Sequence, residues 1–244
     1  MKAILVRIGI DKAYGSWNAP VDPQTAEFVY VPIPDGKDKE HAHGGVRLFS
    51  EVVKPLSDFM TGRGFAWDDL HCPPDLLGCK MHLDPDFQHL TYGDNGVRRG
   101  AGVAKLGNGD VLVFYSGMRS ILPPGRLLYG LVGLFVVNEV VPAVTVTPCR
   151  QIENAHTRWP VISDDDIVVR GRRGFSGRLS RCIPIGEWRE RAYRVCPAIE
   201  ESWGGLSVKN GYIQRSAVPP QFLDADRFYS WFLAQDVTLL ERNN

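Results

Sequence analysis

The most apolar stretch of the chain, LLYGLVGLFVV at 127–137, places the strongest constraint on its fold. Eleven residues are too few to cross a bilayer as a helix, so this segment must be a buried strand or a buried helix. It begins a longer run, 127–146, that we interpret as two strands broken near Asn138 and Pro142. The second half of the chain is therefore expected to supply the core strands of a sheet.

Other segments enriched in β-branched and aromatic residues predict the remaining strands. The segment 110–116 follows a turn signal at Asn108-Gly109, and alternating β-formers at 2–8 open the chain. Further strands are expected at 28–33, 166–170 and 181–185.

Two regions have apolar residues at helical spacing. In the first, 46–60, Pro55 favours a division into two short pieces. The second, 221–235, follows Pro219-Pro220 and predicts a helix near the C-terminus. Its apolar stripe is interpreted as core packing and consists of Phe222, Leu223, Phe228, Trp231 and Phe232.

No internal repeat, low-complexity tract or interdomain linker divides the 244 residues. We therefore expect an α+β fold in which residues 1–244 form a single domain. Its sheet is expected to be mixed or largely antiparallel, with long ordered loops and a C-terminal helix. The longest irregular stretch, 62–100, is rich in Gly, Pro and Asp, and long loops of this kind are often functional.

Charge and cysteine content narrow the class of protein. The formal net charge is zero, so any contact with nucleic acid must come from a local basic patch, and no membrane partner is expected. The five cysteines match no disulfide framework and indicate free thiols in a reducing compartment. The N-terminus is apolar only briefly before Arg7, which favours an opening strand over a signal peptide. A soluble, cytoplasmic protein is expected.

The segment CKMHLDPDF, 79–87, is the most informative for function because His82, Asp84 and Asp86 are spaced two residues apart. Pro85 disfavours helical geometry at Asp84, and alternate residues of an extended segment point to one face. One imidazole and two carboxylates would then share a small volume and could act as an acid–base site. The alternative is a structural turn, since Asp-Pro-Asp is also a good turn sequence.

Two further segments carry candidate catalytic residues. The loop RIGIDKAYG, 7–15, would place Asp11 beside a ligand if it is more than a structural turn. His156, in the polar loop ENAHTRW, is a candidate to complete the site around His82, although a lone loop histidine is usually a surface or capping residue.

Arginines near glycines suggest contacts to phosphate. The loop RGRRGFSGRLSR, 170–181, combines bidentate donors with glycines that let the backbone approach an anion; its alternative is a solvated loop. Arg119 follows the strand end YSG, where it would suit a phosphate or a carboxylate. The predicted phosphate-binding residues are Arg98, Arg99, Arg119, Arg170, Arg172, Arg173, Arg178 and Ser176.

Metal and cofactor binding have little support in the sequence. The nearest approach to a zinc frame is His71, Cys72, Cys79 and His82, but the two cysteines are seven residues apart, so we expect no structural zinc. A transient hard metal on Asp84 and Asp86 is a better alternative. We assign no metal ligand, and the residues identify no cofactor.

Taken in order, these motifs resemble the nucleotide modification associated domain family, type three. The resemblance spans nearly the whole chain. It rests on RIGIDKAYG at 7–15, VPIPDG at 31–36, KMHLDPDF at 80–87, GDVLVFYSGMR at 109–119, YGLVGLFVVNEV at 129–140, His156 and SGRLSRCIPI at 176–185. Members of that family are predicted to modify nucleobases or DNA, often in phage and mobile-element systems.

The resemblance implies that the polar residues of these motifs form an active site: Asp11, His82, Asp84, Asp86, Arg119, His156 and Arg178. The chain departs from the family after the His-Leu-Asp-Pro-Asp block, where it has YGDNGVRRGAG at 92–102.

Three functions are compatible with these patterns. The first is a nucleobase-modifying enzyme acting on DNA or on a nucleotide, with other enzymes of a modification system as possible partners. The second is a non-catalytic reader of modified bases. The third is a metal-dependent nucleotide hydrolase using His82, Asp84 and Asp86.

Overall fold

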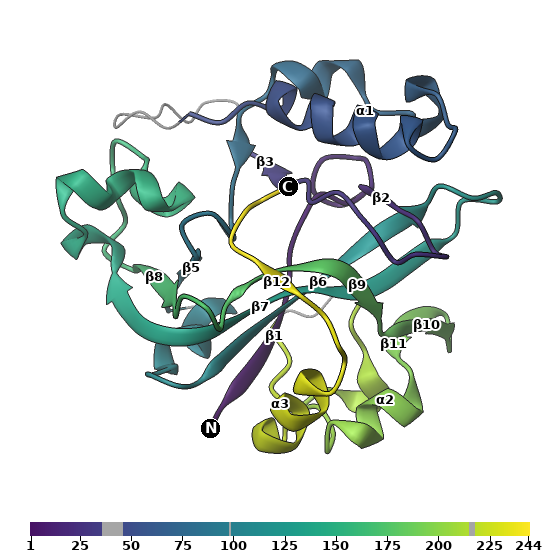
Figure 1. The fold of residues 1–244 in the computed structure, drawn as a ribbon. Coiled ribbons are helices and arrows are strands. Elements are labelled where there is room, and N and C mark those ends of the chain that lie inside the picture. The colour runs from purple at the N-terminus through teal and green to yellow at the C-terminus, as the bar shows by residue number, and fades with distance from the viewer. Residues whose placement is uncertain (36–45, 98, 215–217) are drawn as a thin grey trace.

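A mixed sheet of eight strands forms the centre of the fold (Figure 1). The computed structural model describes residues 1–35, 46–97, 99–214 and 218–244. Its main path runs β1 (Ala3–Arg7), β6 (Val111–Ser120), β7 (Leu127–Pro142), β8 (Asp166–Gly171) and β5 (Thr91–Asn95). Three more strands attach to it: β2 (Pro20–Val21) to β6, β9 (Gly177–Pro184) to β7, and β12 (Leu239–Leu240) to β9. β1 and β2 lie parallel to β6, and the other pairs are antiparallel. The expected α+β fold with a mixed sheet is confirmed.

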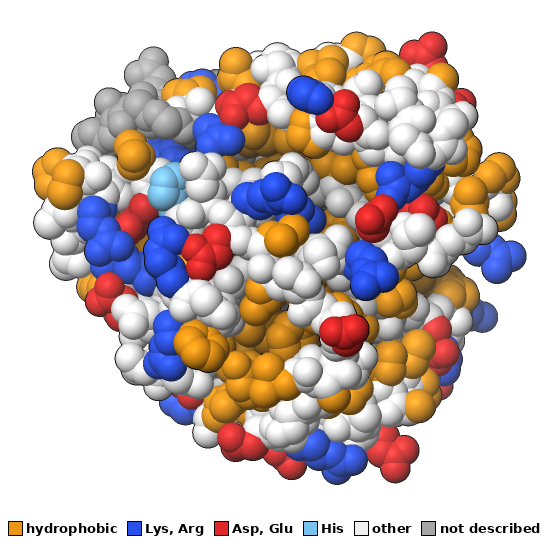
Figure 2. All heavy atoms as spheres, in the orientation of Figure 1, with side chains coloured by type: hydrophobic (Ala, Val, Ile, Leu, Met, Phe, Trp, Pro, Cys, Tyr) orange, Lys and Arg blue, Asp and Glu red, His pale blue; other side chains and the backbone are white. Residues whose placement is uncertain are grey.

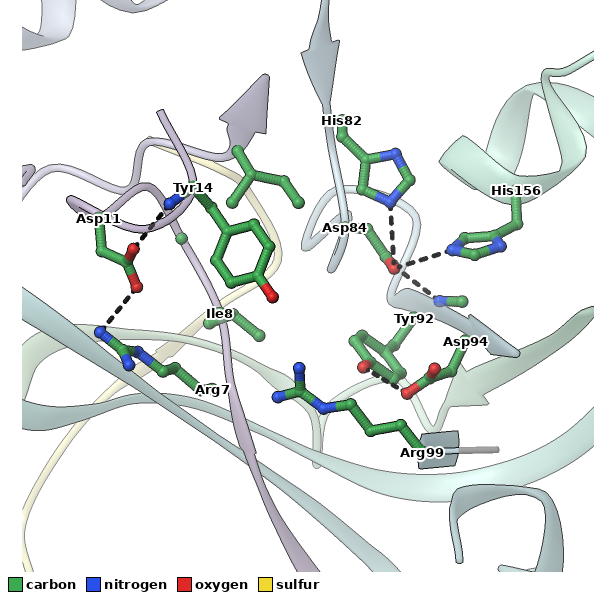
Figure 3. Close-up of a pocket in the computed structure, with 13 residues that line it drawn as sticks. Arg7, Ile8, Asp11, Tyr14, His82, Asp84, Tyr92, Asp94, Arg99 and His156 are labelled. Atoms are coloured by element: carbon green, nitrogen blue, oxygen red, sulfur yellow. Dashed lines mark hydrogen bonds and ion pairs between the residues drawn. The ribbon is translucent and has the colours of Figure 1, made fainter. Parts of the chain in front are cut away.

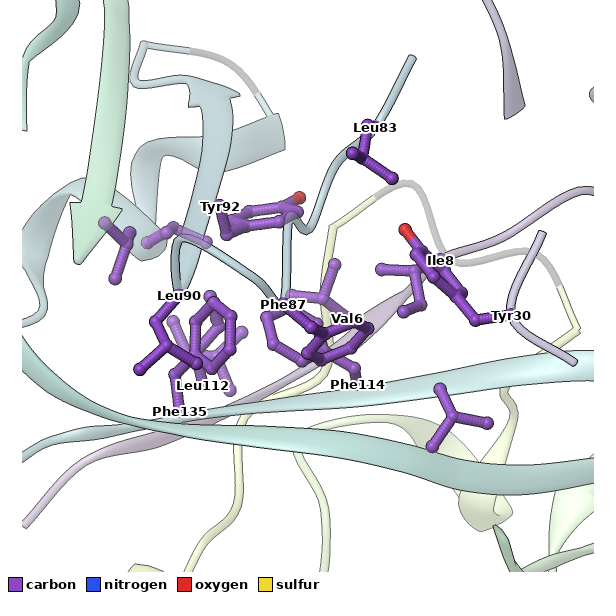
Figure 4. Packing of buried hydrophobic residues seen from close by; sticks show 14 of the residues in the cluster. Val6, Ile8, Tyr30, Leu83, Phe87, Leu90, Tyr92, Leu112, Phe114 and Phe135 are labelled. Carbon is purple, nitrogen blue, oxygen red and sulfur yellow. The ribbon is translucent and has the colours of Figure 1, made fainter. Parts of the chain in front are cut away.

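Alternation along the strands divides the core between the two faces of the sheet. On β1, Ile4 and Val6 pack into one cluster, while Ala3 and Leu5 pack into the other. The first cluster also includes Phe87 and Phe114, whose rings pack edge to face with their centroids 5.7 Å apart (Figure 4). This cluster lies under the segment 82–94, which carries most of the candidate catalytic residues.

β7 is one continuous strand, so the predicted break into two strands is wrong. A bulge between Val137 and Glu139 leaves Asn138 exposed while pairing continues on both sides. Before the bulge β7 pairs with β6 and β9, and beyond it the strand pairs with β8. Pro142 ends the strand and does not interrupt it.

The helices cover opposite faces of the sheet (Figure 1). One face carries α1 (Val53–Thr61), which follows the short helix η1 (Phe49–Val52) directly. The expected division at Pro55 is wrong, because Pro55 lies in the first turn of α1, where its missing N–H is tolerated. The other face carries α2 (Pro197–Ser202), α3 (Ala225–Leu233) and the hairpin of β10 (Gly186–Arg189) and β11 (Ala192–Val195).

The apolar stripe predicted at 221–235 packs in the core as expected, with one exception. Phe228 and Phe232 are buried with Trp203, whereas the side chain of Leu223 is 68% exposed and lies before the helix. No helix in the described ranges combines the length and hydropathy that crossing a bilayer requires.

The predicted strand at 28–33 forms only in part. Phe28 makes a single bridge to Val21, and β3 (Ile33–Pro34) pairs with β4 (Met81–His82). The loops contain short 3₁₀ helices: η2 (Trp67–Leu70), η3 (Pro74–Gly78), η4 (Arg99–Ala101), η5 (Val103–Lys105), η6 (Ala143–Thr145), η7 (Pro148–Glu153), η8 (Ala155–Thr157) and η9 (Lys209–Gly211).

Candidate functional site

Two histidines and one aspartate from distant parts of the chain meet at the end of a cavity (Figure 3). His82 comes from β4, Asp84 follows it, and His156 comes from η8. Oδ2 of Asp84 lies 3.9 Å from Nε2 of His82 and 3.7 Å from Nε2 of His156. The expected proximity of His156 to His82 is therefore found, with ring centroids 5.2 Å apart.

Each histidine also contacts a second carboxylate through its other ring nitrogen, Nδ1. Nδ1 of His82 lies 3.0 Å from Oδ1 of Asp35, and Nδ1 of His156 lies 3.0 Å from Oδ2 of Asp166. A proton on Nδ1 would satisfy each of these contacts and would leave the lone pair of Nε2 facing Asp84. The two imidazole side chains are each 13% exposed.

Asp84 is buried with only one of its oxygens hydrogen-bonded in the described ranges. Oδ1 accepts hydrogen bonds from the backbone N–H of Gly93 at 2.7 Å and from Nδ2 of Asn154 at 3.0 Å. Burial raises the pKa of Asp84 to about 6, although His156 and His82 act in the opposite direction. Burial alone would lower the pKa of His156, but the hydrogen bond to Asp166 and the charge of Asp84 raise it.

Gly93 lets β5 approach this cluster more closely than any other residue type would. A Cβ at this position would lie 2.4 Å from Cδ2 of His156 and 2.5 Å from Oδ1 of Asn154. The same oxygen of Asn154 accepts the backbone N–H of His156 at 2.9 Å, which caps η8. The site therefore depends on glycine at position 93.

We expect Gly93→Ala to displace the His156 ring and to lower the free energy of unfolding by about 1–3 kcal/mol, because the added methyl group overpacks a buried site. Urea denaturation measures the stability, and the chemical shifts of the His156 ring report its displacement. Gly107→Ala is the matched control, since a Cβ there meets nothing within 4 Å. Equal stabilities for the two variants would contradict the close approach.

The cavity beside the cluster has a volume of about 220 Å³. Its walls include Tyr14 and Asp11 from the N-terminal loop and Tyr92 and Asp94 from β5. The Arg99 side chain points into it from η4, and no hydrogen bond or ion pair of its guanidinium is found among the residues described (Figure 3).

Asp11 lines this cavity as expected, but on the side away from the histidines (Figure 3). Its Oδ2 forms an ion pair with Nη2 of Arg7 at 2.7 Å, and its Oδ1 accepts the backbone N–H groups of Ala13 and Tyr14. Asp11 thus orders the loop that carries Tyr14, and the sequence correctly grouped it with the pocket.

The expected convergence of Asp86 with His82 and Asp84 is wrong. The extended segment ends at Asp84, and the chain then turns, with two backbone hydrogen bonds joining Asp86 and Thr91. The Asp86 carboxylate is fully buried and forms an ion pair with Nη2 of Arg158 at 2.8 Å. Asp86 is not among the residues that line the cavity.

The predicted phosphate ligands of the Arg-rich loop contact other residues of the chain and do not line the cavity with Asp84. Arg170 is paired with Glu139 and Glu153. The Ser176 hydroxyl is buried against the backbone of β7. The Arg178 guanidinium is buried over the Phe28 ring, and this burial lowers its pKa to about 10.

The other predicted phosphate ligands are scattered. Arg172 donates to Asn108, Arg173 forms an ion pair with Glu241, and Arg119 donates to the carbonyl of Gly125 in a different cavity. Arg98 lies outside the described residues. On the face shown in Figure 2, basic side chains are interspersed with acidic ones. Of the predicted phosphate ligands that the structure describes, only Arg99 lines the cavity with Asp84.

The side chains considered for zinc are also apart. Sγ of Cys79 contacts the carbonyl of Asp75, and His82 is bound to Asp35. Within the described ranges, the one group of three His, Cys, Asp or Glu side chains that could share an ion is His82, Asp84 and His156.

Four residues of the site were not predicted as site residues: Asp35, Gly93, Asn154 and Asp166. Asp166 ends a run of three aspartates, 164–166, whose sequence does not distinguish it from its exposed neighbours. Asn154 precedes His156 by two residues, and such spacing is a signal for capping of a short helix that could have been recognised. Asp35 and Gly93 carry no signal of this kind.

The arrangement is suited to two kinds of chemistry. A buried carboxyl group between two imidazoles can move protons to and from a ligand. The same three groups are also suitable donors for a metal ion.

In a comparison with family models, the model described as nucleotide modification associated domain 3 matches residues 2–201. Comparisons with curated proteins and with solved structures gave no match. The matched range includes His82, Asp84, Arg99 and His156.

Proposed function

Because the chain belongs to the nucleotide modification associated domain 3 family, we propose that it is an enzyme that modifies the base of a nucleotide in the cavity beside Asp84. Family membership supports a role in nucleotide modification. The catalytic role is supported by the geometry of the cavity, where reactive groups and an arginine face the same space.

The observation that carries this proposal is the pair of carboxylate-bound histidines that face one buried carboxylate. Asp35 and Asp166 hold the imidazoles so that both Nε2 atoms point at Oδ2 of Asp84. A surface or capping histidine needs no such support. Desolvated groups whose pKa values are shifted, like Asp84 and His156, are typical of active sites.

The size of the cavity favours a single base as the group that enters. Its volume of about 220 Å³ lies below the range of about 300–1,000 Å³ found for drug-sized ligands. A base inside a duplex cannot reach such a site, so the substrate is a free nucleotide or a base that has left its stack. Tyr14 and Tyr92 offer aromatic surface at the walls.

Arg99 is the group that we assign to the phosphate of the substrate. We expect Arg99→Ala to weaken the binding of a nucleoside monophosphate by about 10- to 100-fold, because a hydrogen bond to a charged group contributes about 1.5–3 kcal/mol. Binding of the corresponding nucleoside, which lacks phosphate, should change little. Isothermal titration with the four deoxynucleoside monophosphates and their nucleosides measures both.

Arg172→Ala is the control for this experiment, since Arg172 donates to Asn108 and is not among the residues that line the cavity. An equal loss for both variants would indicate general electrostatic attraction and would contradict a phosphate site at Arg99. Tight binding of duplex DNA that a mononucleotide cannot displace would overturn the assignment of the cavity to a single base.

A further inference from the structure

We infer that His82, Asp84 and His156 bind one divalent transition-metal ion, with zinc as the probe of choice. The inference deepens the proposed function and rests on the same site, but it is tested by metal content without any substrate. It replaces the hard metal on Asp84 and Asp86, which the sequence offered as an alternative, with an ion held by two histidines and one aspartate.

The three donor atoms are close enough to share an ion. One donor atom of each side chain lies within 4.8 Å of the other two. Tetrahedral zinc with bonds of about 2.0–2.1 Å places neighbouring donors about 3.3 Å apart. The separations of 3.7 and 3.9 Å from Oδ2 of Asp84 exceed this by only a few tenths of an ångström, which small side-chain rotations can close.

The residues behind the donors match the surroundings that metal ligands need. Metal-binding histidines almost always donate their second ring N–H to a carboxylate, a carbonyl or water, and Asp35 and Asp166 accept from His82 and His156 in this way. Oδ1 of Asp84 is held by Gly93 and Asn154, so Oδ2 is left for the ion.

The surroundings of Oδ2 of Asp84 also suit a bound ion, because its contacts at 3.7 and 3.9 Å are to the two imidazole nitrogens. The Asp84 side chain is only 5% exposed, and no hydrogen bond to Oδ2 is found in the described parts of the chain. A buried carboxylate oxygen aimed between two imidazole nitrogens is costly unless a cation or a proton satisfies it.

The donor set indicates which ion and which kind of site. Imidazole suits zinc, iron, copper and nickel, whereas magnesium and calcium prefer oxygen ligands alone. Three protein ligands with a free position toward a cavity are typical of catalytic sites and not of structural ones. The free position faces the space that we assign to the base, so a water bound there would lie beside the substrate.

The test uses the full chain after treatment with a chelator, followed by titration with Zn²⁺ and elemental analysis. We expect one zinc per chain in the wild type and no saturable binding in the His82→Asn, His156→Asn double variant. Asp166→Asn keeps all three ligands and should weaken zinc binding by about 10- to 100-fold through loss of the contact to His156.

His89→Asn is the matched control, because His89 also pairs with a buried carboxylate, Asp86, at 2.9 Å but lies outside the cavity. It should bind zinc like the wild type. Thermal unfolding of the metal-free proteins establishes that each variant is folded.

Two results would overturn the inference: no saturable binding of Zn²⁺, Co²⁺, Mn²⁺ or Fe²⁺ by the wild type, or equal losses in His89→Asn and in the double variant. Zinc binding without nucleotide binding would retain the metal site and reject the proposed function. Nucleotide binding and modification without a bound metal would retain the proposed function and reject the metal site.

Discussion

Asp84→Asn is expected to lower nucleotide modification by about 100-fold or more while leaving the unfolding temperature nearly unchanged. The amide keeps an oxygen that can accept from Gly93 and Asn154, so the hydrogen bonds of Oδ1 survive. The anionic oxygen between the two histidines is lost, and with it either proton transfer or metal binding. Because burial raises the pKa of Asp84 to about 6, its charge is not a source of stability at neutral pH.

The measurement is mass spectrometry of nucleosides from the DNA and from the nucleotide pool of cells that express each variant. A modified nucleoside should appear with the wild type and with Asp75→Asn, a surface control on η3, but not with Asp84→Asn. Equal amounts of product from Asp84→Asn would show that the chemistry takes place elsewhere. A large fall in unfolding temperature would instead indicate that Asp84 is a structural residue.

Local patterns predicted those parts of the fold that depend on nearby residues. The strands β1, β6 and β8 and the helix α3 follow from alternation, helical spacing and turn signals. The continuity of β7 could not be predicted in this way. Asn138 resembles a strand break in the sequence, yet pairing with β8, whose residues are about 30 positions away, carries the strand across the bulge.

The candidate site could be predicted only where its residues lie close together in the sequence. His82 and Asp84 lie on an extended segment, so their two-residue spacing brought them together. The pattern failed at Asp86 because a turn begins there, and a turn removes the alternation on which the argument depended. His156 and Asp166 reach the site through pairing of β5 with β8, which no short-range pattern encodes.

The Arg-rich loop shows the opposite error. Its arginines were predicted to be free to bind phosphate because their ion-pair partners lie far away in the sequence. Glu139 and Glu153 come from β7 and η7, and Glu241 comes from the C-terminal segment. A cluster of like charges therefore says little about a binding surface until the partners of each side chain are known.

Asp86 illustrates how a residue next to the site can serve the fold instead. Its Oδ2 accepts from Arg158, and its Oδ1 accepts from Nδ2 of Asn243 and from the turn N–H groups of Gln88 and His89. Burial opposes ionisation, but the hydrogen bond from His89 and the charges of His89 and Arg158 lower the pKa of Asp86. The carboxylate thus joins the turn at 86–91, the loop that carries His156 and the C-terminal segment.

Arg158→Met is accordingly expected to be the most destabilising substitution considered, lowering the free energy of unfolding by about 3–5 kcal/mol. The Arg158 and Asp86 side chains are 2% and 0% exposed, so the variant takes a buried guanidinium away from a buried carboxylate and leaves the imidazole of His89 as its remaining ion-pair partner. For a chain of this size the loss corresponds to a fall in unfolding temperature of roughly 6–20 °C. Thermal and urea denaturation measure it directly.

Adding Asp86→Asn to Arg158→Met should recover part of this loss, because the amide removes the buried carboxylate charge and keeps an acceptor for the turn N–H groups. Arg173→Ala is the control, since its ion pair with Glu241 lies on the surface and contributes less than about 1 kcal/mol. If Arg158→Met unfolds like the control, Asp86 does not anchor the fold through this pair. Asp86 would then again be a candidate catalytic residue, because a buried carboxylate that does not stabilise the fold is expected to have a functional role.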